Sequence, residues 1–306
     1  MQFNYEGTDI TGDVDIVECI HHDESVGKCD FVEIEMENAG TWFRWKPQCD
    51  DRIEIQMDGY TTGTLYLNAI LPKSGRYRII ATSIPRAAQR CAYKSYAGMR
   101  IEDIMESCAA ECGMQSALFG IDGNIRYPYI QRRFEGAAAF LSRVLKCEGA
   151  VLKSINATFT AIGIEYAQKM DATQQIEMKN DQDGVDYFRR DIGKLSSVEI
   201  RTPFADGTAH DLGAQFGQPV IYSDAYPATD NAQALRWARG LILHHNRDCE
   251  ELNMRTQFNA GFTAMARIDI QSQGDMDGNW IIDNAVHDFV NRKSAVRLLR
   301  CIDTIQ

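Results

Sequence analysis

The chain has 306 residues, a formal net charge of -11 and a hydrophobic fraction of 44%. At roughly 150 residues per domain, this length predicts about two domains with full cores, and the composition excludes disordered and fibrous proteins. The acidic balance argues against specific nucleic-acid binding through phosphates and against docking on anionic lipid. No stretch reaches the roughly eighteen apolar residues of a membrane helix, and the first residues lack the features of a signal peptide. The nine cysteines are therefore expected to be free thiols in a reducing cytosol.

Residues 1–85 predict a half-buried antiparallel sheet. Apolar and polar residues alternate through 32–37, 52–57 and 65–68, which gives each run one apolar face. Turn residues separate the runs, with Asp58-Gly59, Gly63 and a Pro-Lys-Ser-Gly turn at 72–75. We therefore expect a first β module over 1–85.

The pattern changes to helical spacing after residue 86. Apolar residues at steps of three and four predict one helix over 101–112 and a second over 137–145, each followed by a glycine suited to a left-handed helix end, Gly113 and Gly149. A strand pair is expected around 150–165. We interpret 86–165 as a small α/β module inserted between β modules.

The last part of the chain, 166–306, predicts a second β module. A polar stretch is followed by strand-like runs at 195–201 and 218–222 and by a helix near 231–246 that Asp230 is placed to cap. Three more strands are expected at 265–271, 279–287 and 294–302. The predicted fold class is α+β, mainly β, with two antiparallel β-barrel modules around the α/β insertion.

The chain also contains an internal repeat. The run Arg-Ile-Glu-Ile-Gln at 52–56 precedes Gly59 and Gly63, and the run Arg-Ile-Asp-Ile-Gln at 267–271 precedes Gly274 and Gly278. Every matched position is 215 residues from its counterpart, and both runs lead into an apolar strand. This repeat predicts one strand–turn–strand hairpin used twice, and hence a duplicated β module.

Several residues with metal-binding chemistry are better explained structurally. Neighbouring residues diverge on both strands and helices, so His21-His22 and His244-His245 do not converge on one ion. Cys108 and Cys112 lie on the apolar stripe of a helix, where cysteine packs as a small hydrophobe. The acidic loops 179–190 and 273–284 lack the closing carboxylate of a calcium loop and are better explained as hairpin turns. We predict no catalytic, cofactor-binding or metal-binding residue, and no cofactor.

Two tryptophans leave a binding function open. The stretch 41–45 is expected to be a strand with Trp42 and Trp45 on one face, which fits a sugar-stacking or partner platform as well as a core edge. Paired carboxylates of a glycoside hydrolase have no positive support, because no acid pair is distinguished by its surroundings. The chain also lacks the phosphate-loop, GxGxxG, GxSxG and HExxH motifs.

The order of features resembles the late control gene D family, the baseplate hub proteins of phage tails and tail-like particles. The similarity is carried by the tryptophans at 42–45 before the acidic hairpin 50–55, by the helix entry at 95–104, by the helix at 131–149 and by the closing strands 278–282 and 286–288. The chain carries Asp50-Asp51 where the family pattern has Gly-Asp, and 166–230 matches no part of the pattern.

The resemblance implies a non-enzymatic structural protein of a contractile phage tail or tail-like bacteriocin. It implies a homotrimer whose two tube-like modules per chain adapt a sixfold tail tube to a threefold spike. The implied partners are the tail tube protein, the central spike protein, the tape measure protein and other baseplate proteins. The implied location is the baseplate of a particle assembled in the bacterial cytoplasm. Two alternatives remain, a tail-associated cell-wall hydrolase and a carbohydrate- or protein-binding β module using Trp42 and Trp45.

Overall fold

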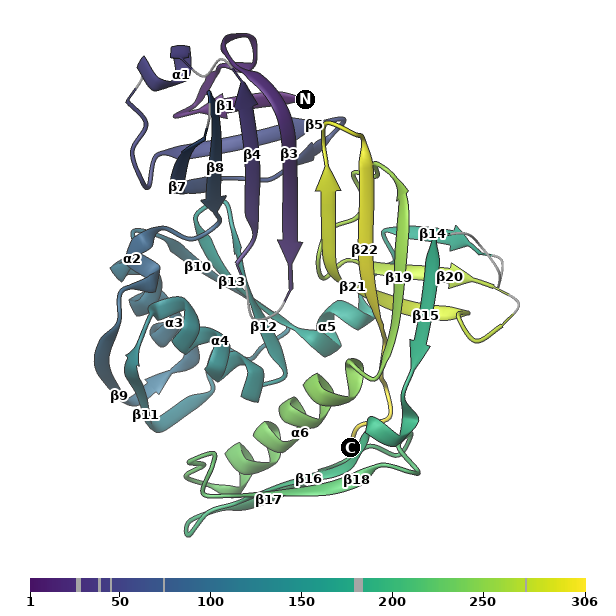
Figure 1. Ribbon diagram of the computed structural model, residues 1–306. Coiled ribbons are helices and arrows are strands. Elements are labelled where there is room, and N and C mark those ends of the chain that lie inside the picture. Colours follow the sequence, from purple (N-terminus) through teal and green to yellow (C-terminus); the bar gives the residue numbers. More distant parts are fainter. Residues whose placement is uncertain (26–28, 38–39, 45, 74, 179–183, 273) are drawn as a thin grey trace.

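The computed structural model describes residues 1–306 except 26–28, 38–39, 45, 74, 179–183 and 273. Strands make up 49% of the chain and helices 20%, which confirms a mainly β fold. The largest sheet has 14 strands and runs through the molecule from β15 at one end to β2 at the other. Figure 1 shows this sheet across the top and right of the molecule, with helices α2 to α6 below it.

The first β copy, as we call β1 to β8, forms one end of this sheet. Its order is β3-β4-β8-β7-β5-β1-β2, antiparallel throughout, with the short strand β6 added to β5. Polar and apolar residues alternate along these strands, so that one face packs on a core around Phe3, Ile34 and Ile55. The elements are β1 (Gln2–Tyr5), β2 (Thr8–Asp9), η1 (Thr11–Asp13), β3 (Asp15–Glu24), β4 (Phe31–Glu37), α1 (Gly40–Arg44), β5 (Arg52–Met57), β6 (Tyr60–Thr61), β7 (Leu65–Lys73) and β8 (Arg76–Thr82).

The second β copy repeats this arrangement with strands from the last part of the chain. The order β15-β19-β22-β21-β20 matches β3-β4-β8-β7-β5 in space and along the chain, again antiparallel. The next strand differs, because β14 pairs with β20 in parallel whereas β1 pairs with β5 antiparallel. The elements are β14 (Gln174–Glu177), β15 (Val185–Arg189), β19 (Glu250–Gln257), β20 (Arg267–Gln271), β21 (Gly278–Asp288) and β22 (Lys293–Arg300).

The repeated hairpin is the same in both copies down to its register. Arg52 pairs with Tyr66 and Ile53 with Leu65 in the first copy, just as Arg267 pairs with Ile281 and Ile268 with Trp280 in the second. Each copy has a bulge at the same place, between Leu67 and Ala69 and between Ile282 and Asn284. The predicted duplication is confirmed.

The two copies also share a strained backbone position. Asp50 and Met265 both have a φ of 72°, and both donate a backbone hydrogen bond to the residue before the bulge, Leu67 or Ile282. A positive φ is the conformation in which glycine lacks the usual penalty, which explains why the resembled pattern has a glycine where this chain has Asp50.

An α/β module and a long helix lie against the lower side of the sheet in Figure 1. Helices α3 and α4 are the two predicted ones, each with its apolar stripe buried, and Gly113 and Gly149 follow them with φ near 69°. The elements are α2 (Arg86–Gln89), β9 (Ala92–Arg100), α3 (Ile101–Glu111), β10 (Gln115–Phe119), β11 (Arg126–Glu135), α4 (Ala137–Cys147), β12 (Ala150–Ile155), β13 (Thr158–Gly163) and α5 (Ile164–Lys169).

The stretch between β15 and β19 forms a separate small sheet covered by α6. This stretch contains η2 (Asp191–Gly193), β16 (Leu195–Arg201), β17 (Asp206–His210), β18 (Gln218–Ser223) and α6 (Asn231–Arg247). The Asp230 side chain accepts the backbone N–H of Gln233 at 2.9 Å, which confirms the expected cap. Residues of β16 and α6 share one apolar core with α3 and α4, so this insertion packs on the α/β module.

Some expectations differ from the structure. No closed barrel is found in the part of the chain that the structure describes, because the two copies join edge to edge in one open sheet. The stretch 40–44 is a helix, α1, and not a strand. The predicted boundaries at 86 and 166 stay predictions.

Candidate assembly interface

The junction between the two copies is a strand pair. β21 pairs with β20 along its first residues and with β3 along its last, where Asn284 to Asp288 lie opposite Glu24 to Ile20. Backbone hydrogen bonds of 2.9 Å from Ser25 to Asp283 and from Phe289 to Cys19 bracket this segment. The junction is therefore an ordinary antiparallel ladder between two similar β units.

Buried aromatic and histidine side chains pack at this junction. The ring nitrogen Nδ1 of His21 lies 2.9 Å from the Tyr60 hydroxyl, and His287 contacts the Phe262 carbonyl and the Ser294 hydroxyl, each at 2.9 Å. Burial lowers the pKa of His21 to about 3 and also lowers the pKa of His287. Both imidazoles are therefore neutral near pH 7 and act as core residues.

A buried lysine ties the junction to the α/β module. Lys153 on β12 places its Nζ 2.5 Å from Asp23 Oδ1, 3.1 Å from Asp30 Oδ1 and 2.8 Å from the Glu24 carbonyl. Asp23 also accepts the backbone N–H of Ala264 at 2.9 Å, in the loop before β20. One ammonium group therefore connects the end of β3, the α/β module and, through Asp23, the second copy.

The pKa values of this cluster follow from burial and from the opposite charges. Burial raises the pKa of Asp30 to about 6, against the attraction of Lys153. Burial alone would raise the pKa of Asp23 too, but Lys153 holds it below its usual value, and the two carboxylates raise the pKa of Lys153. The lysine is charged at any ordinary pH, so the cluster depends on the carboxylates staying ionised.

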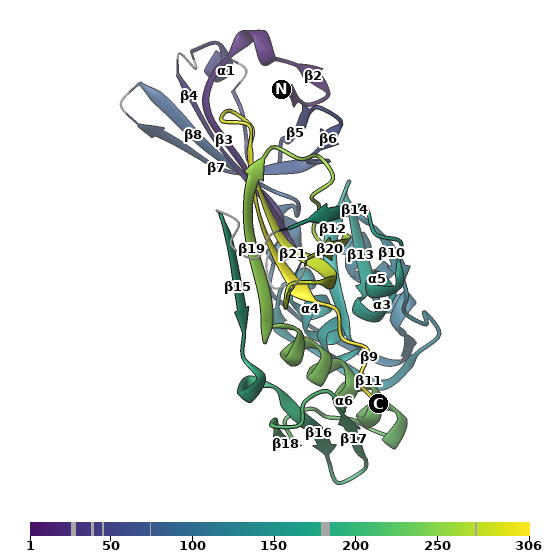
Figure 2. The same cartoon turned by 90° about the vertical axis from the view of Figure 1, so that its right-hand side faces the viewer.

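β15 and residues 69–73 of β7 are backbone edges of the sheet that carry no partner strand in the described part of the chain. β15 pairs only with β19, and residues 69–73 of β7 pair only with β8. Figure 1 places these edges on opposite sides of the molecule, and Figure 2 shows the β7–β8 hairpin extending away from its body. Large apolar side chains are exposed at both edges, with Leu71 exposed by 47% and Phe188 by 44%.

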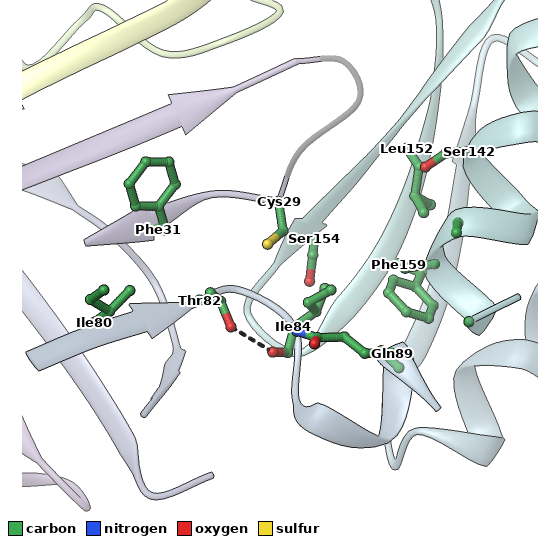
Figure 3. A pocket seen from close by; sticks show the side chains of 14 residues that line it. Cys29, Phe31, Ile80, Thr82, Ile84, Gln89, Ser142, Leu152, Ser154 and Phe159 are labelled. Atoms are coloured by element: carbon green, nitrogen blue, oxygen red, sulfur yellow. Dashed lines mark hydrogen bonds between the residues drawn. The ribbon is translucent and has the colours of Figure 1, made fainter. Parts of the chain in front are cut away.

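A cavity with a volume of about 690 Å³ lies between the first copy and the α/β module. Figure 3 shows Phe31 and Ile80 on the sheet side and Leu152 and Phe159 on the other. Its lining is apolar apart from Cys29, Gln89 and a few hydroxyl and backbone groups, and burial raises the pKa of Cys29 to about 11. A protonated thiol is a poor nucleophile, and the described lining residues include no carboxylate, imidazole or amine side chain.

The histidines and cysteines considered as metal ligands have separate partners in the structure. Among the described residues no group of three His, Cys, Asp or Glu side chains could hold an ion. His244 contacts the Ala150 carbonyl at 3.0 Å whereas His245 contacts the Gly193 carbonyl at 2.9 Å, and Cys108 and Cys112 are buried in the core. In the loop 273–284, Asp277 accepts the Ser272 backbone N–H, as in a turn, while residues 179–183 of the loop 179–190 lie outside the described residues.

The tryptophan platform is not present at Trp42. Its ring is exposed by 1% and packs against Phe3 and Tyr5, with a centroid distance of 4.6 Å to Tyr5. The core alternative is therefore the correct one for Trp42, and Trp45 lies outside the described residues. A helix at 40–44 turns the side chain of Trp42 inward, which the alternation argument for a strand missed.

The fold has clear counterparts among solved structures. A tail protein from Neisseria meningitidis superposes with a TM-score of 0.76 at 12% identity, covering 98% of this chain and 95% of that protein. A 43 kDa prophage MuSo2 tail protein from Shewanella oneidensis gives 0.74 at 12% identity, covering 98% and 97%. The chain has the fold of phage tail proteins.

A third neighbour comes from a secretion machine. The Escherichia coli c3393 protein is described as a component of the type VI secretion system with structural similarity to the T4 bacteriophage tail proteins gp27 and gp5. It gives a TM-score of 0.60 at 11% identity, covering 99% of this chain and 78% of that one. No protein-family model matches the sequence, and no curated protein does either. The similarity is thus one of fold.

Sequence reasoning missed the parts of the interface that depend on long-range pairing. Lys153, Asp23 and Asp30 gave no signal, because they lie far apart in the sequence. Strands β15 and β19 were also missed. In the structure, buried and half-buried residues alternate along the first residues of β19. The offset of 215 holds only for the repeated hairpin, so it could not have located the remaining pairs.

Proposed function

We propose that this protein is the baseplate hub of a contractile phage tail or tail-like bacteriocin. In this role a homotrimer presents six similar β units, two from each chain, to a sixfold tail tube on one side and a threefold spike on the other. The observation that carries the proposal is the duplication, in which two copies share strand order, register and bulge. Three chains with two equivalent units each can match both symmetries.

The structural neighbours support a role in a tail or a related injection machine. Two of them are tail proteins, and the third is part of a secretion system and similar to phage tail proteins. We extend the proposal to the partners of such a hub, which are the tube protein, the central spike, the tape measure protein and other baseplate proteins. The location follows as the particle baseplate, after assembly in the bacterial cytoplasm.

We also propose that the protein works without catalysis. The cavity between the first copy and the α/β module is lined mainly by apolar and hydroxyl groups, and its one thiol is protonated. Among the described residues no helix is long and apolar enough to span a bilayer. A purified sample that clears peptidoglycan, and loses this activity when one carboxylate is replaced, would contradict this part.

The assembly proposal is tested by mass and by shape. Light scattering or native mass spectrometry of the purified chain should give a species of three chains, and electron microscopy should show a threefold ring with a central hole. The ring should bind the tube protein on one face and the spike protein on the other when they are produced together. A chain that stays monomeric up to about 100 µM, far above the Kd of a stable interface, would refute it.

A further inference from the structure

The junction inside one chain provides a template for a junction between two chains. In the repeat, β7 corresponds to β21 and β3 corresponds to β15. Inside the chain, the second half of β21 pairs with β3. The same halves of the equivalent strands, residues 69–73 of β7 and β15, carry no partner strand among the described residues.

We propose that β7 of one chain pairs antiparallel with β15 of a second copy, in the register of the internal β21–β3 pair. This inference rests on the proposed trimer and specifies its interface. Because β7 and β15 lie at opposite sides of the molecule, the contact is head-to-tail, which is the kind that closes rings. Three internal and three intermolecular junctions would then form one continuous ring of strands, without unpaired edges at these positions.

The register follows from the matching ladders. Val286 lies opposite His22 in the internal junction. The equivalent of Val286 is Leu71, because the two hairpins correspond position by position across the shared bulge. The equivalent of His22 is Phe188. His22 pairs with Phe31 on β4, and Phe188 pairs with Glu251 on β19. Phe31 and Glu251 are equivalent, because they occupy the same place opposite β8 and opposite β22. Leu71 and Phe188 therefore lie opposite each other.

The side chains fit this pairing. Leu71 and Phe188 are the large exposed apolar residues of the two free edges, and the register brings them into direct contact. Apolar and aromatic cross-strand pairs stabilise antiparallel sheets. On the opposite face the register sets Pro72 against Tyr187, so two further non-polar surfaces meet there.

Backbone geometry agrees as well. Arg190 donates its N–H to Cys249 at 2.7 Å, so by alternation the Phe188 amide faces β19, and the amides of Tyr187 and Arg189 face the free side. On β7 the amide of Ile70 faces the free side in the same way. Pro72 also faces it and lacks an N–H, so the intermolecular ladder has one bond fewer than the internal one.

Cysteine cross-linking tests the register directly. Leu71 and Phe188 form a non-hydrogen-bonded pair, whose Cα atoms lie about 4.5 Å apart, within the range of about 4.4–6.8 Å that a disulfide spans. Under mild oxidation the double variant L71C/F188C should give covalent dimers and trimers on a non-reducing gel, with no larger species because the ring closes at three chains.

Two controls define the outcomes of the cross-linking test. The pair L71C/D186C places the thiols on diagonal positions about 7–8 Å apart, beyond the span of a disulfide, and should not cross-link. The unsubstituted chain under the same oxidation measures the background of the native cysteines. Trimers in solution without a 71–188 cross-link overturn the register and leave the proposed hub intact, whereas absence of any trimer removes both.

A charge exchange gives a second, independent test. L71D and F188D each place a carboxylate in the proposed contact and should lose the trimer at about 20 µM, whereas the combination L71K/F188D should regain it, because opposite charges face each other across the strands. F216D is the matched control, since Phe216 is exposed by 75% and lies in the loop between β17 and β18. Retention of the trimer by both single variants would overturn the pairing.

Discussion

Replacing Lys153 with methionine tests the buried charge cluster that joins the β copies to the α/β module. Methionine keeps most of the volume of the lysine stem but removes the ammonium group from Asp23 and Asp30. Both carboxylates are buried in the folded protein, with side chains exposed by 7% and 10%. The substitution therefore leaves two acidic groups close together without their counter-charge.

The expected cost is large for a single side chain. Removing one partner of a buried ion pair costs about 3–5 kcal/mol, because the remaining charge has lost its solvation and its partner. The measurement is the free energy of unfolding in urea near pH 7. The control K169M removes a lysine that is exposed by 79% and lies 3.8 Å from Glu165, and it should change stability by less than about 0.5 kcal/mol.

The cost of K153M should also depend on pH, with a definite sign. In the native chain the lowered pKa of Asp23 contributes stability that is present above about pH 4 and is lost as the pH falls through its folded value. Without Lys153, burial raises the pKa of both carboxyls, so the folded variant loses stability as the pH rises from about 4 upward. The difference between native and variant is therefore larger at pH 8 than at pH 5.

The neutral triple variant K153M/D23N/D30N separates charge from packing. It should regain most of the lost stability, because no buried charge remains. A K153M protein that loses less than about 1 kcal/mol near pH 7, or whose loss is the same at both pH values, would refute the reasoning.

Three further predictions concern packing and use the same unfolding assay. G240A should lower the free energy of unfolding by at least about 1 kcal/mol despite the better helix propensity of alanine, since its Cβ would lie 2.1 Å from the Cys147 carbonyl. The control G12A, where nothing lies within 4 Å of the new Cβ, should stay nearly neutral. Equal effects of the two substitutions would contradict the argument. E148A should cost about 2–4 kcal/mol because Tyr127 and Trp237 lose their acceptor at 2.8 and 2.7 Å, while the exposed E106A should cost little. W42A should cost about 3–5 kcal/mol by emptying a core site, and a variant that instead kept full stability and lost glycan binding would restore the platform hypothesis.

Patterns within a short stretch of sequence predicted much of the local structure. Helices α3, α4 and α6 follow from apolar residues at steps of three and four, and β4, β5 and β7 follow from alternation and turn residues. The repeat at 52–56 and 267–271 predicted the duplicated hairpin, because an identical spacing of apolar residues and glycines demands the same strand and turn geometry in both places. The helix at 40–44 was missed since five residues are too few to show a period.

Only the tertiary structure decided which strands are neighbours and which edges are left open. Pairings such as β21 with β3 join residues more than 250 positions apart, and alternation states that a strand has two faces without naming its partner. The same holds for Lys153 on β12, whose two carboxylate partners come from β3 and from the residue before β4 in the first β copy. The sequence by itself determined that one β unit occurs twice. The placement of Leu71 and Phe188 at the free edges follows from long-range pairing, which depends on chain folding as a whole.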